Sequence, residues 1–243
     1  MPRTCFDIIY QDLKNKILNE TFSYESFLPT EVELTKTYSC SRNTLRRALT
    51  LLSDEALLQP IHGKGVRVIW QKRTDEYIGN LEGLESFQEY AQRNNLIPST
   101  DVKIFENITC TESVSQQTGF KPGDALIHIK RIRKLNGISR QIDNDYLLAS
   151  AAGQLTAEDA SVSIYAYLEN VLKMRILKSK RNITIELATE DDYQYLSLGL
   201  YNCVAVIESH SFNSKGIMFG YTQTRSHPET FCYNTISKRN IKH

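Results

Sequence analysis

The chain has 243 residues, of which 41% are apolar and 23% are charged, and its formal net charge is +1. These values are typical of a soluble globular protein with two domains of ordinary size, and they exclude a chain that is basic throughout. No apolar run approaches the roughly 20 residues of a membrane-spanning helix, so a membrane protein is excluded as well.

Cysteine and histidine usage excludes two further classes. The five cysteines are scattered without a C-x-x-C pair, which favours reduced thiols over a disulfide framework. The five histidines show no metal-ligand spacing, so we expect neither a metal site nor a cofactor. Because the N-terminus also lacks the apolar core of a signal peptide, we expect a cytoplasmic protein with no membrane partner.

The first predicted elements are three helices, of which the second and third are joined by a tight turn. Apolar residues recur at helical spacing from Phe6 to Ile17, which predicts an amphipathic helix over residues 6–20. A second helix is predicted over residues 30–38, directly after a proline whose missing N–H costs nothing at that position. The turn at residues 38–41 then resembles the turn of a helix-turn-helix.

The third helix has arginines on one face. Ser41 is suited to cap its N-terminus, because the hydroxyl can accept a hydrogen bond from a free N–H of the first turn. Spacing of i, i+3, i+4 and i+7 gives an apolar face of Leu45, Ala48, Leu49 and Leu52. The opposite face contains Arg42, Asn43, Arg46, Arg47 and Thr50. Arginine can bind guanine and asparagine can bind adenine, so this face is typical of a helix that reads the major groove. A surface helix with solvated arginines is the alternative.

A basic hairpin follows the third helix. Strands are predicted over residues 57–61 and 66–70, with Gly63 and Lys64 at the tip. Glycine lets the backbone approach DNA closely, and the lysine supplies a charge that a phosphate or a narrow minor groove attracts. Residues 41–73 contain seven Lys or Arg against two acidic residues, a local net charge of +5. The pattern predicts a winged helix-turn-helix.

Residues 6–70 resemble the DNA-binding domain of GntR-type bacterial transcription regulators. The resemblance rests on the order and spacing of Leu28-Pro29-Thr30-Glu31, Ser41-Arg42, Thr44-Leu45-Arg46 and Gly63-Lys64-Gly65. It implies that the third helix reads the major groove of double-stranded DNA and that the wing glycine enters the minor groove. The candidate DNA-binding residues are Thr30, Glu31, Ser41, Arg42, Asn43, Thr44, Arg46, Arg47, Gly63 and Lys64.

The periodicity changes after a polar stretch at residues 71–75, so we expect domains at residues 1–72 and 73–243. The helices predicted for the second domain cover residues 86–94, 112–118, 163–172 and 189–198. The predicted strands cover residues 102–108, 125–135, 138–148, 183–187, 204–212, 217–224 and 231–236. Turns such as Asn136-Gly137 join several of them into hairpins. A mainly antiparallel sheet with helices against it is an α+β fold.

Two arginines occupy the apolar face of the strand at residues 125–135. Side chains alternate with period two, so Arg131 and Arg133 share the parity of Ile127 and Ile129 and point inward, about 7 Å apart. Arginine cannot lose its charge, so a buried pair demands an anion. That anion is either an internal carboxylate or a bound phosphate, to which the planar guanidinium is well suited.

Residues 77–238 resemble the UTRA effector-binding domain of the HutC subfamily of GntR regulators, whose fold resembles that of chorismate lyase. The resemblance rests on the arginine pair and on the stretches at residues 83–87, 143–146, 163–165 and 219–225. It implies that Arg131, Arg133, Ser163 and Ser86 hold a phosphate, and that Asp143 and Tyr165 meet sugar hydroxyls. The candidate effector-binding residues are Ser86, Phe87, Arg131, Arg133, Asp143, Ser163, Tyr165, Tyr221 and Arg225.

The resemblance implies a sequence-specific repressor that binds a two-fold operator as a homodimer and is controlled by a phosphorylated sugar. Trehalose 6-phosphate is the expected effector, and glucosamine 6-phosphate or N-acetylglucosamine 6-phosphate is the alternative. An enzyme is the second hypothesis, but the chain has no G-x-S-x-G, no H-E-x-x-H and no glycine-rich phosphate loop. A ligand-free architectural DNA-binding protein is the third, and the inward arginine pair argues against it.

Overall fold

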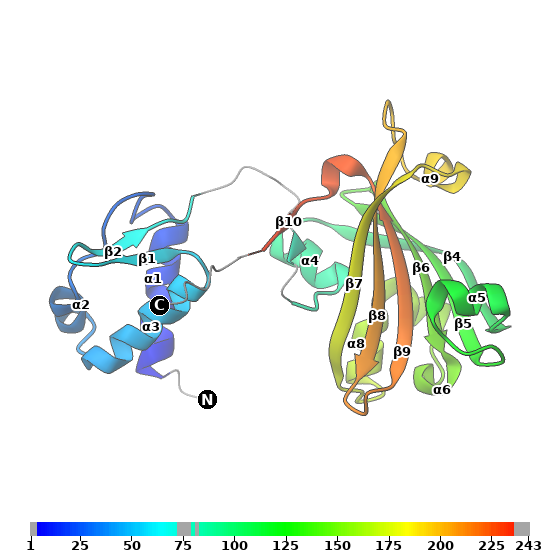
Figure 1. Cartoon of the computed structure of the whole chain (residues 1–243), viewed down its shortest axis with the longest axis horizontal. Coiled ribbons are helices and arrows are strands. Elements are labelled where there is room, and N and C mark those ends of the chain that lie inside the picture. The colour runs from blue at the N-terminus through cyan, green and yellow to red at the C-terminus, as the bar shows by residue number, and fades with distance from the viewer. Residues whose placement is uncertain (1–3, 72–78, 81–82, 236–243) are drawn as a thin grey trace. The chain divides into compact units, whose positions relative to one another are not determined.

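The structure is a computed structural model, and it describes residues 4–71, 79–80 and 83–235. These residues form two compact units, one up to residue 71 and one from residue 79 (Figure 1). Most of the predicted boundary at residues 71–75 lies outside the described residues. So does the end of the strand predicted at residues 231–236, together with the rest of the chain to residue 243.

The first unit is built from three helices around a common core. They are α1 (Cys5–Leu18), α2 (Glu31–Thr37) and α3 (Arg42–Asp54). Helix α3 begins where the sequence indicates, because the Ser41 hydroxyl accepts a hydrogen bond from the Thr44 N–H. Its four predicted apolar residues are all buried against the other helices. This burial holds α3 in place and leaves its polar face exposed.

The wing is a two-stranded antiparallel hairpin. Strand β1 (Leu58–Ile61) pairs with β2 (Gly65–Val68), and Leu58 and Val68 anchor its base in the helical core. Gly63 and Gly65 have φ values of +72° and +111°, which residues other than glycine rarely adopt. The hairpin predicted from the glycine-rich tip is therefore confirmed, with shorter strands than expected.

The second unit is organised around a six-stranded antiparallel sheet with the order β4-β5-β6-β9-β8-β7 (Figure 1). Its strands are β4 (Pro98–Thr109), β5 (Ala125–Leu135), β6 (Ile138–Leu148), β7 (Ile176–Leu187), β8 (Cys203–Asn213) and β9 (Met218–Ser226). Two short strands, β3 (Gly79–Asn80) and β10 (Tyr233–Asn234), pair with each other in parallel. The α+β class is confirmed, and the sheet is the scaffold on which the second unit's cavity is built.

Helices cover both faces of this sheet. One face packs against α6 (Ala149–Ala152), α7 (Ala157–Val162) and α8 (Ile164–Asn170) through a core that includes Ile127, Ile129 and Phe219. The segments that contain α5 (Glu112–Thr118) and α9 (Glu190–Tyr195) bury apolar residues on the other face. Helix α4 (Phe87–Arg93) precedes β4, and a short 3-10 helix, η1 (Pro228–Thr230), follows β9. Both faces of the central strands are therefore buried.

Several predicted bounds in the second unit are corrected. Helices α6 and α7 were not expected, because each has at most six residues and too few turns to show a periodic pattern. Strand β7 begins seven residues earlier than expected, because it lies at the edge of the sheet and its polar residues 178–182 interrupt the apolar alternation. The strand predicted at residues 231–236 contains only β10 among the described residues.

Candidate functional sites

The polar face of α3 is exposed. Arg42, Asn43, Arg46 and Arg47 are all accessible to solvent, and Thr44 is half-buried. Arg46 is held by Glu31 of α2 through three N–O contacts of 3.0–3.1 Å. The guanidinium of Arg47 lies 5.0 Å from the ring centre of Phe6 in α1. The predicted major-groove residues thus lie together, and two of them are positioned by neighbouring helices.

Two residues expected to bind DNA also have structural roles at helix N-termini. Thr30 caps α2 by accepting a hydrogen bond from the Glu33 N–H, and Ser41 caps α3 in the same way.

Lys64 is exposed at the wing tip, and a side chain at the adjacent Gly63 would meet no atom within 4 Å. The tip is therefore sterically open on its Gly63 side.

The second unit contains a cavity of about 180 Å³ on the sheet face that α6, α7 and α8 cover. All but two of the expected effector residues line it, and these are Ser86, Phe87, Arg131, Arg133, Asp143, Ser163 and Tyr165. They come from β5, β6, α8 and the start of α4, which are distant in the chain. The sheet register brings them together, since Arg131 on β5 pairs directly with Asp143 on β6.

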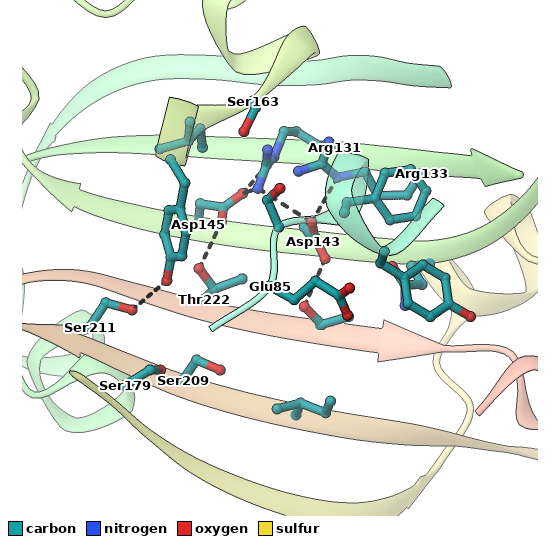
Figure 2. Close-up of a pocket in the computed structure, with 18 of the residues that line it drawn as sticks. Glu85, Arg131, Arg133, Asp143, Asp145, Ser163, Ser179, Ser209, Ser211 and Thr222 are labelled. Carbon is teal, nitrogen blue, oxygen red and sulfur yellow. Dashed lines mark hydrogen bonds and ion pairs between the residues drawn. The ribbon is translucent and has the colours of Figure 1, made fainter. Parts of the chain in front are cut away.

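The buried arginines of this cavity are neutralised by carboxylates of the adjacent strand (Figure 2). Arg131 donates to Asp145 from Nε at 2.8 Å, and Arg133 donates to Asp143 from Nε at 2.9 Å. Each arginine is only 4% exposed, so the two buried charges require anionic partners. In the structure, the anions that balance the two arginines are therefore internal carboxylates. Asp143, which was expected to face sugar hydroxyls, is bound to both arginines. We call these four residues the arginine–aspartate cluster.

Two threonines and the Ala160 carbonyl, which accepts a hydrogen bond from Arg131 at 3.3 Å, complete the cluster. Thr224 donates to Asp143 and Thr222 donates to Asp145, both at 2.8 Å. Burial together with the nearby Arg131 lowers the pKa of Arg133 to about 10, so its charge persists at neutral pH. Burial favours a raised pKa for Asp143, but the two guanidiniums hold that pKa below its ordinary value. Burial raises the pKa of Asp145. The cluster has two positive and two negative groups, so it is electrically neutral.

The remaining cavity residues have defined partners. The Arg133 guanidinium lies 5.0 Å from the ring centre of Phe87. The Ser163 hydroxyl caps α8 by accepting a hydrogen bond from the Ala166 N–H at 3.2 Å, which leaves its own proton available to a ligand. The Tyr165 hydroxyl lies 2.8 Å from Ser211 Oγ. Several hydrogen-bonding side chains thus converge on one cavity.

Tyr221 and Arg225 do not line the cavity, which corrects the site expected from the sequence. On β9, Thr222 and Thr224 face the cavity, so the residues of opposite parity face away. Tyr221 is fully buried and donates to Glu208, and Arg225 is bound to Asp192 and Glu186. Both residues therefore lie on the opposite face of the sheet, where their hydrogen bonds and ion pairs stabilise the fold.

Several residues of the cavity wall were not predicted from the sequence. Asp145, Arg181, Ser179, Ser209, Ser211, Thr222 and Thr224 also line it. Period-two alternation on β7 and β8 could have indicated which residues share a face. The side of the sheet to which that face belongs depends on pairing between distant strands.

A winged helix-turn-helix with an exposed arginine-bearing helix defines the class of DNA-binding transcription regulators. The second unit, an antiparallel sheet with a cavity lined by charged and polar side chains, is a domain of a different kind in the same chain. Comparison with known proteins agrees with both assignments. The model of the gntR family of bacterial regulatory proteins matches residues 7–68, and the UTRA domain model matches residues 93–231.

The chain belongs to the GntR family of bacterial transcription regulators and has the UTRA domain of the HutC subfamily. The transcriptional regulator TreR of Bacillus subtilis is 30% identical, over 96% of this chain and 97% of the relative. The crystal structure of YydK from B. subtilis covers 97% of this chain and all of that one, with a TM-score of 0.76 and 21% identity. The B. subtilis trehalose repressor effector-binding domain covers 59% of this chain and 99% of that one, with a TM-score of 0.54 and 26% identity.

The relatives are transcription regulators, so the chain is a regulator and not an enzyme. In the described part of the chain, no helix has both the length and the apolar character needed to cross a bilayer. Within the same residues, no three His, Cys, Asp or Glu side chains are grouped so as to hold a metal ion.

Proposed function

We propose that this regulator is a sequence-specific repressor whose operator affinity is controlled by a phosphorylated sugar, with trehalose 6-phosphate as the effector of a trehalose operon. The observation that supports it most is the cavity of the UTRA domain, where two buried arginines lie beside serine and tyrosine hydroxyls. The similarity to TreR of B. subtilis over nearly the whole chain supports the choice of sugar, because the structure of that protein's effector-binding domain is described as that of a trehalose repressor.

On the DNA side, Arg42, Asn43, Thr44 and Arg46 contact bases of the major groove, while Lys64 and Gly63 approach the minor groove. The exposure of all these groups except the half-buried Thr44, and the fixed position of α3 on its core, support this assignment. A homodimer presents two such helices to a two-fold operator, as is usual for this class.

On the effector side, the phosphate binds where Arg131, Arg133, Ser86 and Ser163 meet. The Nη2 atom of Arg133 makes no hydrogen bond within the described residues, and the Ser163 proton is available, so donors remain after the cluster's internal bonds. Because the carboxylates of the arginine–aspartate cluster already balance both guanidiniums, a phosphate that binds there competes with Asp143 and Asp145 for them. Effector binding therefore rearranges the cluster, which links β5 to β6 and β9.

The test is a melting-temperature screen of the full chain against sugar phosphates, followed by an operator mobility assay with the best ligand. Trehalose 6-phosphate is expected to raise the melting temperature and to release the operator. If glucosamine 6-phosphate or N-acetylglucosamine 6-phosphate does so instead, the repressor assignment is kept and the effector is corrected. If no sugar phosphate changes either measurement, the proposal is wrong.

A further inference from the structure

Three serines form a row of hydroxyls across the cavity from the arginine–aspartate cluster. Ser179 on β7 pairs with Ser211 on β8. Ser209 lies two residues before Ser211 on β8, so its side chain is on the same face of the sheet. Figure 2 shows Ser179, Ser209 and Ser211 side by side, away from Arg131 and Arg133. All three line the cavity. We call Ser179, Ser209 and Ser211 the serine row.

The carboxylates of the arginine–aspartate cluster have hydrogen-bond partners, whereas most hydroxyls of the serine row have none among the described residues. Each carboxylate of the cluster accepts bonds from an arginine and a threonine. In contrast, the buried Ser179 Oγ has no hydrogen-bond partner in the described part of the chain. Among those residues Ser209 Oγ makes no hydrogen bond either, and Ser211 Oγ meets only Tyr165. Buried hydroxyls are normally paired, so Ser179 and Ser209 add unused hydrogen-bonding capacity on β7 and β8, at a distance from the free donors of Arg133 and Ser163.

The chemistry of the row fits a neutral polyhydroxylated group. A serine hydroxyl both donates and accepts, as a sugar hydroxyl does, so the two can pair in either direction. The floor beside Ser211 is Gly220, where an added Cβ would lie 3.0 Å from Leu147 Cδ2. Leu147 and Phe219 also line the cavity, so this part of its wall is apolar, which suits the C–H face of a sugar ring.

The sheet order sets the distance between the two ends of the cavity. Strand β5 with Arg131 is separated from β8 with Ser209 by β6 and β9. Three strand spacings correspond to roughly 14 Å between these backbones, before the side chains reach inward. A ligand with two sugar rings spans such a distance better than a single ring held at the arginines.

We propose that the serine row is a second subsite that binds the uncharged sugar end of the effector, with Ser179 and Ser209 determining which sugar is accepted. The proposal rests on the proposed function, in which the phosphate binds at Arg131 and Arg133. It adds that the cavity selects a disaccharide phosphate over a monosaccharide phosphate.

The test measures binding of trehalose 6-phosphate, glucose 6-phosphate and inorganic phosphate to the full chain by titration calorimetry. The double variant Ser179→Ala/Ser209→Ala is expected to bind trehalose 6-phosphate at least tenfold more weakly. Its affinity for glucose 6-phosphate and for inorganic phosphate should change less than twofold. Ser99→Ala, an exposed serine on β4 outside the cavity, is the matched control and should behave as the wild type.

A second measurement separates lost contacts from lost structure. Because Ser179 Oγ has no partner among the described residues, Ser179→Ala should melt without ligand at the same temperature as the wild type or higher. The subsite is refuted if the double variant binds trehalose 6-phosphate as the wild type does, or weakens for all three ligands equally. A wild type that binds none of them refutes the proposed function itself, and the subsite with it.

Discussion

At the residue scale, the buried arginines of the second unit have two different tasks. Arg131 and Arg133 line a cavity, whereas Arg225 is 6% exposed and bound to Asp192 through both Nε and Nη2. Asp192 is fully buried and also accepts hydrogen bonds from the backbone and side chain of Thr189, the N-cap of α9, so it completes the capping box of that helix. This pair ties α9 to β9, and all three guanidinium nitrogens of Arg225 donate to protein acceptors. We interpret it as structural.

Replacing Asp192 is therefore expected to destabilise the second unit. Asp192→Asn leaves Arg225 buried without its main partner, and removing one member of a buried pair typically costs about 3–5 kcal/mol. Chemical denaturation monitored by circular dichroism measures the loss. Asp101→Asn is the control, because Asp101 is partly exposed and pairs with Lys103 and Lys134, neither of which is buried, so about 1 kcal/mol or less is expected. Equal losses for both variants would contradict the structural role.

The same carboxylate predicts a pH dependence of stability. Burial alone would raise the pKa of Asp192, but hydrogen bonds from Arg225 and Thr189 hold it below its ordinary value of 3.8. A lowered pKa in the folded state gives stability that is present above the unfolded-state pKa and is lost as the pH falls through the folded-state pKa. The wild type should lose stability below about pH 4. Asp192→Asn should show a flatter curve there, and parallel curves would refute the assignment.

Arg46 gives the residue-scale prediction for DNA. It is exposed, and Glu31 holds it in a fixed direction. Arg46→Ala should weaken operator binding at least tenfold, because one bidentate base contact is worth about 1–3 kcal/mol. A mobility assay measures the change. Lys215→Ala, in the exposed turn after β8, changes the net charge equally and should leave binding unchanged. Unchanged binding of Arg46→Ala would reject its role as a base-reading residue.

At the element scale, the wing and α3 are expected to contribute to DNA binding in different ways. Helix α3 is fixed by four buried side chains and a capping serine, so its polar face has one orientation. The wing is a short hairpin anchored at Leu58 and Val68, with a cation at a tip built from glycines. A rigid helix suits recognition of bases, whereas a lysine at a hairpin tip suits recognition of phosphates.

Lys64→Ala tests this division. Loss of one phosphate contact should weaken binding to operator and non-operator DNA by a similar factor. It should also reduce the slope of log K against log salt concentration by about 1. Fluorescence anisotropy over a salt series measures both quantities. If Lys64→Ala weakens the operator alone and leaves the salt slope intact, Lys64 contacts a base and the division is wrong.

At the scale of the whole molecule, the proposed function requires that effector binding to the second unit and operator binding to the first unit are thermodynamically coupled. If trehalose 6-phosphate lowers operator affinity by some factor, operator DNA must lower trehalose 6-phosphate affinity by the same factor. Such factors are typically about 5–150. The arginine–aspartate cluster is the element we expect to change on effector binding, because its charges are already balanced in the structure.

The reciprocal measurement is a titration of trehalose 6-phosphate into the full chain with and without saturating operator. We expect weaker effector binding in the presence of operator, by the factor seen in the DNA assay. Scrambled DNA of the same length is the control. Equal effector affinity in all three samples would mean that the two domains are not coupled, even if each binds its own ligand.

The sequence by itself determined the elements whose signals are local. Ser41 and the apolar spacing after it defined α3, and glycines defined the wing tip, because a cap, a helical period and a positive φ each involve only neighbouring residues. The same holds for the β5–β6 hairpin, whose turn residues Asn136 and Gly137 both have positive φ. The inward direction of Arg131 and Arg133 also followed from period-two alternation along one strand.

Only the tertiary structure decided what those arginines meet. Asp145 became a counter-ion because β5 and β6 pair in one register, and the serine row formed because β7, β8 and β9 pair in another. Tyr221 and Arg225 face away from the cavity because alternation along β9 directs Thr222 and Thr224 towards it. Pairing between distant strands depends on how the whole sheet buries its two faces, and a shift of one residue would exchange them. That is why a strand's pattern predicts its two faces, while only the assembled sheet decides which one lines the cavity.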